Sequence, residues 1–133
     1  MLFTRDLTIP AGTTHDAPAT TELQLIAGTV RRIDVVFPPG PATRAHVTAR
    51  DSLFQLVPAN PDEDINQDEA VVRSDMDYKL QRPYTLIFDG WSPEARYEHT
   101  VTFNVELAPE SQDQLVQLLK MLAGGSAGVL QGR

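Results

Sequence analysis

Apolar and polar residues alternate most regularly between residues 97 and 107. One set comprises Tyr97, His99, Val101, Phe103, Val105 and Leu107, and the residues between them are Glu98, Thr100, Thr102, Asn104 and Glu106. Because successive side chains of a β-strand point to opposite faces, this pattern predicts a strand with one buried and one solvated face. Residues 84–89 form a second β-rich run, and the turn-like residues 90–96 predict that the two strands form a hairpin or a neighbouring pair.

Shorter β-rich segments precede this pair. They cover residues 7–9, 21–26, 30–37, 44–50, 53–57 and 77–80, with turn residues at 27–28, 38–41 and 60–61. Short, evenly spaced strands are typical of two-sheet architectures. No ten-residue helical pattern interrupts them, which disfavours a parallel α/β sheet. The sequence therefore predicts an all-β fold, an antiparallel β-sandwich or jelly roll of about seven to eight strands, with residues 1–108 as its domain.

The periodicity changes after Pro109. Apolar residues now follow the i, i+3, i+4, i+7 spacing of an amphipathic helix, at Leu115, Leu118, Leu119 and Leu122. Ser111 is suited to be its N-cap, with Gln114 three residues on, and Gly124 can close its C-terminus. A helix of about twelve residues is marginal alone, so the leucines must pack either on their own sandwich or on a neighbouring molecule.

Residues 124–133 have the glycine-rich composition of a flexible tail. Together with the helix they form a second unit, residues 109–133, which we expect to act as an arm between subunits. The partner-binding residues predicted in this arm are Leu115, Leu118, Leu119, Leu122, Val129 and Leu130.

Charge and composition narrow the classes of function. The chain has 133 residues, a net charge of −7 and scattered rather than clustered basic residues, so we expect no nucleic-acid partner. No apolar run approaches the roughly 20 residues that cross a bilayer, and the N-terminus lacks a signal peptide's regions; we expect synthesis in the cytoplasm and no membrane partner. The absence of cysteine excludes disulfides and thiolate metal sites, and no cofactor is expected.

An acidic stretch, residues 62–69, places oxygen ligands at alternate positions, as a calcium loop does. It departs from the EF-hand pattern, because Gln67 stands where the sharp-turn glycine belongs and Arg73 where the bidentate glutamate belongs. A solvated acidic loop is the favoured interpretation, and a calcium site in a surface loop stays open.

The three histidines, His15, His46 and His99, have no metal-ligand spacing. We expect His99 to be a hydrogen-bonded side chain at the rim of the core, on the inward face beside Tyr97. His46 lies on a polar strand face that solvation explains unless it meets an acidic partner. That face also carries Arg44, Thr48 and Arg50.

No pattern of a catalytic nucleophile is present. The serines occur without a Gly-x-Ser-x-Gly elbow, no glycine-rich phosphate loop precedes the helix, and no spacing selects a carboxylate pair. The sequence therefore predicts a protein that is not an enzyme. Trp91 lies near Tyr84 and Tyr97; an exposed cluster would offer a sugar-stacking platform and a buried one would close the end of the sandwich, which we favour.

Several segments together resemble a known group of proteins. They are residues 9–14, 28–30, 32–40, 82–86 and 97–103. They resemble small β-sandwich proteins encoded among the virion genes of tailed phages and prophages. The resemblance covers about residues 7–107, and its motifs are turn and core signatures rather than catalytic ones.

The resemblance implies a virion structural protein, such as a capsid decoration protein or another accessory subunit. Its expected partners are other virion proteins, namely the major capsid protein or copies of itself in a homo-oligomer. The rival hypothesis is a carbohydrate- or calcium-dependent recognition module, which would use Trp91 with Tyr84 or Tyr97, or residues 62–69. A third is a host-side regulator that acts through its acidic surface.

Overall fold

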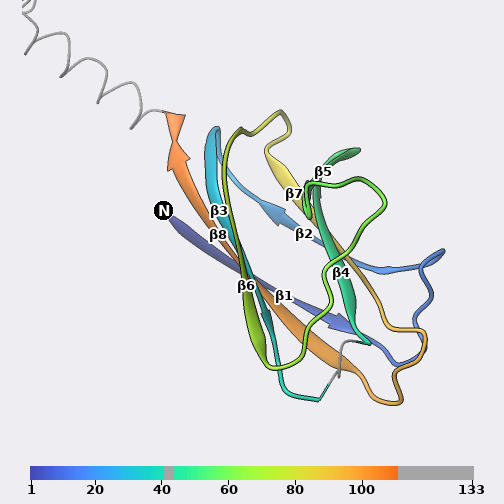
Figure 1. Ribbon diagram of the computed structural model, residues 1–133. Coiled ribbons are helices and arrows are strands. Elements are labelled where there is room, and N and C mark those ends of the chain that lie inside the picture. The colour runs from blue at the N-terminus through green and yellow to red at the C-terminus, as the bar shows by residue number, and fades with distance from the viewer. Residues whose placement is uncertain (41–43, 111–133) are drawn as a thin grey trace, which may run out of the picture.

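Two four-stranded antiparallel sheets face each other in the computed structural model, which describes residues 1–40 and 44–110. One sheet has the order β1 (Leu2–Ile9), β8 (His99–Pro109), β3 (Gly28–Phe37) and β6 (Ala70–Lys79). The other has the order β2 (Ala19–Gln24), β7 (Thr85–Trp91), β4 (His46–Asp51) and β5 (Phe54–Val57). Figure 1 shows the two layers. The predicted all-β sandwich is confirmed.

The strands pair in a nested order. β4 pairs with β5, and β3 with β6, β2 with β7 and β1 with β8, all antiparallel. The chain is therefore one long hairpin that turns between β4 and β5. It is rolled up so that successive strand pairs belong alternately to the two sheets. That winding is the jelly roll. It accounts for the many short strands, because each turn of the roll carries the chain from one sheet to the other.

The core lies between the sheets and comes from the inward-pointing residues of every strand. On β8 the inward set Val101, Phe103, Val105 and Leu107 is fully buried, as the alternating pattern predicts. Phe88 of β7 faces β8 across the core and stacks on Phe103. Among the described residues, no helix is long and apolar enough to span a membrane.

The predicted pairing of the last two strands is wrong. β7 belongs to one sheet and β8 to the other, so the connection between them crosses the end of the sandwich instead of making a hairpin turn. Tyr97, predicted to point inward, lies in that connection and is 74% exposed. His99, the first residue of β8, is half-buried. Alternation identifies a strand but does not tell which strand pairs with it.

β6 is longer than predicted. It covers Ala70–Lys79 instead of residues 77–80, and its side chains alternate between half-buried and exposed along its whole length. Val72, Met76 and Tyr78 pack against the core, and charged residues occupy most of the other face. Because of these charged residues, β6 does not stand out in the sequence as a β-rich run.

The end of β8 marks the limit of the described chain. Gly28 of β3 pairs with Pro109, and the amide of Glu110 donates to the Ala27 carbonyl (2.9 Å). The division into residues 1–108 and 109–133 stays a prediction. The predicted helix and the contact residues Leu115, Leu118, Leu119, Leu122, Val129 and Leu130 lie outside the described residues.

Candidate functional site

A polar cleft of about 580 Å³ opens beside the sheet β2-β7-β4-β5. Its walls come from four distant parts of the sequence. The loop before β2 contributes His15, β4 contributes Arg50, the acidic loop contributes Asp64, and β7 contributes Asp89 and Trp91. The jelly-roll winding is what brings them together, since β4 and β7 are neighbours in this sheet.

An ion pair forms one side of the cleft. Arg50 Nε donates to Asp89 Oδ2 (2.7 Å), and Arg50 Nη1 donates to the Ser52 carbonyl (2.8 Å). Thr20 Oγ1 donates to the other oxygen of Asp89 (2.9 Å). Asp89 is buried, and a buried carboxylate is tolerated when charge-assisted hydrogen bonds replace its hydration. The pair therefore fixes the Arg50 side chain against the sheet.

The acidic loop forms the opposite side, and it is tied to the sheet rather than freely solvated. The Gln55 amide nitrogen donates to the carbonyls of Pro58 (2.9 Å) and Asn60 (3.0 Å). It also donates to the Glu63 carbonyl (3.1 Å). Further along, Val47 and Ile65 exchange two backbone hydrogen bonds, both 3.0 Å. One glutamine therefore holds residues 58–63, the segment that leads into the acidic loop.

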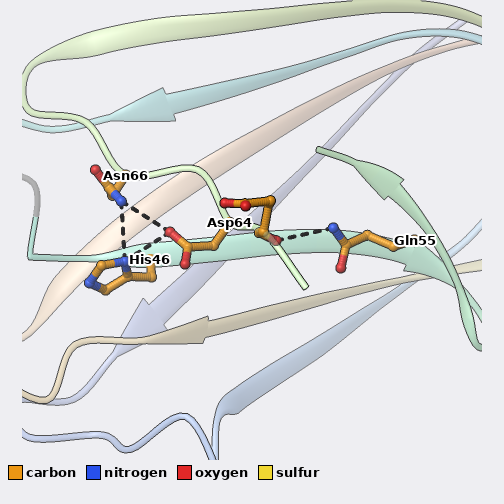
Figure 2. Close-up of polar contacts among 5 residues, drawn as sticks. His46, Gln55, Asp64 and Asn66 are labelled. Atoms are coloured by element: carbon orange, nitrogen blue, oxygen red, sulfur yellow. Dashed lines mark hydrogen bonds and ion pairs between the residues drawn. The ribbon is translucent and has the colours of Figure 1, made fainter. Parts of the chain in front are cut away.

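Three polar side chains join the loop to β4 in Figure 2. His46 Nδ1 lies 2.9 Å from Asp64 Oδ1, and Asn66 Nδ2 donates to the same oxygen (3.1 Å). Solvation was the expected explanation of this polar face unless it met an acidic partner, and the chain itself supplies such a partner for His46. The favoured interpretation of a solvated loop holds for the exposed residues 62, 63 and 67–69, whereas residues 64–66 are half-buried against β4.

Trp91 contacts two histidine rings. The His15 ring packs against it at a tilt of 48°, with ring centroids 4.4 Å apart, and His46 stacks nearly parallel to it at 5.9 Å. The indole is only 9% exposed, which confirms that Trp91 is buried. Its ring therefore closes the base of the cleft and offers no open face for stacking.

Trp91, Tyr84 and Tyr97 do not form an aromatic platform. Tyr84 lies before β7, whereas Trp91 ends that strand, so the two rings lie at opposite ends. Tyr97 is exposed in the β7–β8 connection. Tyr84 and Trp91 are close in sequence but far apart in space, because an extended strand advances by about 3.3 Å per residue.

The chemistry that the cleft offers is hydrogen bonding by planar polar groups. It is lined by carboxylates, a guanidinium and an amide, and its rim carries the exposed carboxylates of Asp62 and Glu63. Within residues 1–40 and 44–110, no group of three or more His, Asp or Glu side chains is arranged to hold a metal ion. The sequence analysis did not identify Gln55 and Asp89 as residues of the site. The one signal available for Asp89 was its position directly after the apolar run 86–88.

A buried carboxylate lies at the other end of β4. Asp51 is 3% exposed, and its Oδ2 accepts from the Tyr78 hydroxyl (2.7 Å) and from the Gln81 amide (3.1 Å). Loss of hydration and the hydrogen bond to the Asp51 carboxylate together raise the pKa of Tyr78 to about 12. This contact joins β6 to the opposite sheet, and no pattern in the sequence indicated it.

Exposed apolar side chains gather at the β4–β5 turn. Leu53 is 97% exposed and Phe54 is 59% exposed. The Phe54 ring stacks on Tyr78 (5.5 Å between centroids), so this turn, which we call the apolar tip (Leu53 and Phe54), is positioned by β6. Single exposed apolar residues are common, but two adjacent large ones at a turn form a surface suited to contact with another protein.

No protein family and no curated protein sequence matches this chain. Solved structures that are similar include a chain of tomato aspermy virus, with 13% identity and a TM-score of 0.41 over 82% of this chain and 79% of that one. A serine protease of Aeromonas sobria has 8% identity and a TM-score of 0.44 over 79% of this chain and 27% of the protease. FLHE has 13% identity and a TM-score of 0.40 over 78% of this chain and 95% of its own. Likenesses this distant say nothing about function.

Proposed function

We propose that the protein is a non-enzymatic structural subunit of a phage virion, a capsid decoration or accessory protein that contacts neighbouring protein subunits. Two features support this proposal. The sequence resembles small virion proteins over the segments quoted above, and the jelly roll is an architecture that recurs in viral capsid domains. A fold alone does not define a function. The proposal therefore also needs a surface feature that is suited to contact with another subunit.

The apolar tip is the observation that carries the proposal. Leu53 is almost fully exposed, and Phe54 presents more than half of its surface to solvent. Burying apolar surface stabilises a contact by roughly 25 cal/mol per Å², and aromatic anchors are enriched in protein interfaces. A tip of this kind, held by Tyr78 on a rigid sandwich, suits an adjacent protein subunit of a particle.

The test is quantitative mass spectrometry of density-purified particles from cells that carry this gene. We expect the chain to co-purify in a fixed ratio to the main coat protein. The variants Leu53→Ser and Phe54→Ser should lower that ratio, whereas Leu2→Ser, which changes an exposed leucine on β1, should not. Particles that lack the chain would overturn the proposal.

The polar cleft favours a second candidate, a carbohydrate-recognition module. Jelly rolls also occur as lectin domains, and hydroxyl-rich ligands are bound by planar carboxylate, amide and guanidinium groups such as those that line the cleft. Such a ligand would be held by hydrogen bonds to Arg50 on one side of the cleft and to the acidic loop on the other, without stacking on Trp91.

Titration calorimetry with a panel of neutral glycans, with and without calcium, tests this second function. Saturable binding that is weakened by Asp62→Ala and Glu63→Ala would support it. The matched control is Glu22→Ala, an exposed carboxylate on β2. An absence of heat with every glycan at millimolar concentration would exclude it.

A further inference from the structure

β6 is an unpaired edge of the sheet β1-β8-β3-β6. Its ten residues hydrogen-bond to β3 on one side only, and no described strand pairs with the other side. An edge strand presents a row of free amide and carbonyl groups, which is a template for pairing with another strand.

The other sheet edges are less available. β1 lies against the edge of the opposite sheet, where Arg5 Nε donates to Thr21 Oγ1 of β2 (3.1 Å). β5 has only four residues. β6 is therefore the longest open edge among the described strands.

The solvent face of β6 carries charges of both signs in a specific order. The exposed residues are Val71, Arg73, Asp75, Asp77 and Lys79. Arg73 reaches Asp34 on its own chain through a long contact of 3.4 Å, whereas Asp75 and Lys79 have no ion-pair partner in the part of the chain that the structure describes. Charged edges usually prevent pairing by repulsion, but an edge of alternating sign can be complementary to itself.

Two copies of β6 can pair antiparallel about a two-fold axis, and the charges select the register. With Ser74 on the axis, Arg73 of each copy lies directly opposite Asp75 of the other. Moving the axis by one residue toward the N-terminus sets Arg73 against Arg73. Moving it toward the C-terminus sets Asp75 against Asp75 and brings Arg73 opposite Asp77, whose charge is already paired with Arg31 of its own chain. Opposite charges stabilise directly facing positions and like charges destabilise them. The register shift opposite Arg31 lies beyond Asp75, so the two Arg73–Asp75 pairs fall in the regular part of the strand.

The inward face of β6 fits the same register. Its side chains are only half-buried, because the strand lies at the margin of the core. With Ser74 on the axis, Val72 of each copy lies opposite Met76 of the other, so two apolar pairs form on the core side. The residue that meets its own symmetry mate is a serine, which is small enough for close approach. One register thus satisfies both faces.

We propose that the protein forms a symmetric dimer with a second copy of itself through antiparallel pairing of the two β6 strands, centred on Ser74. The pairing joins the two four-stranded sheets into one continuous sheet of eight strands. The inference rests on the proposed assembly function and specifies one partner for it. It uses a strand edge, which is a different surface from the apolar tip proposed as the contact with another subunit.

The test is the mass of the whole chain by sedimentation equilibrium at low ionic strength, where the charge pairs are least screened. We expect a dimer. Arg73→Asp and Asp75→Arg each turn two attractive pairs into two repulsive ones, so each variant alone should raise the dissociation constant by about ten- to a hundredfold. Glu22→Arg on β2 is the matched control and should leave the mass unchanged.

Mixing the two variants gives the decisive result. The first variant carries carboxylates at both positions 73 and 75, and the second carries guanidinium groups at both, so a mixed dimer again pairs opposite charges. An equimolar mixture should therefore recover the dimer, and the double variant R73D/D75R should dimerise alone. Recovery also shows that both variants are folded.

Two results overturn the inference, namely a monomeric wild-type chain and a dimer that is indifferent to these changes. The assembly function fails separately from the dimer. If the chain is a monomer that still co-purifies with particles, the dimer is wrong and the assembly function is supported. If it is a dimer that is absent from particles, the dimer is supported and the assembly function is wrong.

Discussion

Phe88 and Phe103 stack face to face across the core, with ring centroids 4.1 Å apart and planes inclined by 10°. Phe88 belongs to β7 and Phe103 to β8, so the contact joins the two sheets at strands that are consecutive in sequence. Both rings are fully buried. The contact of Phe88 with Phe103 therefore holds the two sheets together across the core. In a hairpin, β7 and β8 would instead have been neighbours in one sheet.

Phe103→Ala should therefore be among the most destabilising single changes. Removing a buried aromatic ring leaves a cavity and typically costs about 3–5 kcal/mol of unfolding free energy, and the stacking partner Phe88 would lose its contact surface. Urea denaturation monitored by circular dichroism measures this loss. Val71→Ala, on the solvent face of β6, should change the stability by less than about 0.5 kcal/mol. Equal effects of the two variants would contradict the assigned core.

Most of the strands could be predicted at least in part from the sequence, whereas their pairing could not. The period of two on residues 99–107 follows directly from burial of one face, and it correctly identified Val101, Phe103 and Val105 as core. Nested pairing depends on contacts between residues far apart in the chain, such as Leu2 with Glu106, which no local pattern encodes. β6 was mostly missed because its inner face is half-buried and its outer face charged.

The cleft was anticipated only in pieces. The acidic loop, the polar face of His46 and the aromatic ring of Trp91 were each identified as separate features. Their convergence required the loop to fold back on β4. That depends on the backbone hydrogen bonds between Val47 and Ile65 and on the contact of His46 with Asp64, which no local pattern encodes. Several residues of the site could thus be identified from the sequence. Their arrangement could not, because it depends on how the jelly roll brings distant strands together.

Gln55→Ala should release residues 58–63, the segment that leads into the acidic loop. The amide nitrogen serves three backbone carbonyls in this segment. Water can reach the freed carbonyls, so the expected cost is the net contribution of such a hydrogen bond, about 0.5–1.5 kcal/mol. Hydrogen exchange should show faster exchange at the Glu63 amide, with little change at Phe103 in the core. Gln55→Glu, which keeps the size but removes the donors, should behave like the alanine variant; full protection in the glutamate variant would show that shape rather than hydrogen bonding holds the loop.

Tyr78 should lose its hydroxyl proton only at unusually high pH. Its pKa is raised to about 12 because its hydroxyl is partly removed from water and donates to the Asp51 carboxylate. The unfolded chain releases this proton near the ordinary value of about 10, so the contribution of Tyr78 to stability is complete below about pH 10 and is lost as the pH rises toward 12. Tyrosinate absorbance should show one late transition that Tyr78→Phe removes. A late transition that persists in that variant would assign it to another tyrosine.

Gly28→Ala should destabilise the sheet through lack of space. A Cβ on Gly28 would lie 2.3 Å from the Ala108 carbonyl oxygen and 3.0 Å from Pro109 Cα. Both neighbours are backbone atoms of β8, so the strand itself must move, and overpacking of this kind costs about 1–3 kcal/mol. The urea midpoint of the variant measures the effect against wild type.

Gly12 provides the matched control for this change. It has nothing within 4 Å of its Cβ position, and its φ of +74° is a conformation that asparagine tolerates among non-glycine residues. Gly12→Asn should therefore leave the urea midpoint nearly unchanged, whereas Gly28→Ala lowers it. A neutral Gly28→Ala would mean that β8 can move away from β3 at this end without loss of stability. The hydrogen bond from the Glu110 amide to the Ala27 carbonyl, next to the paired residues Gly28 and Pro109, argues against such a movement.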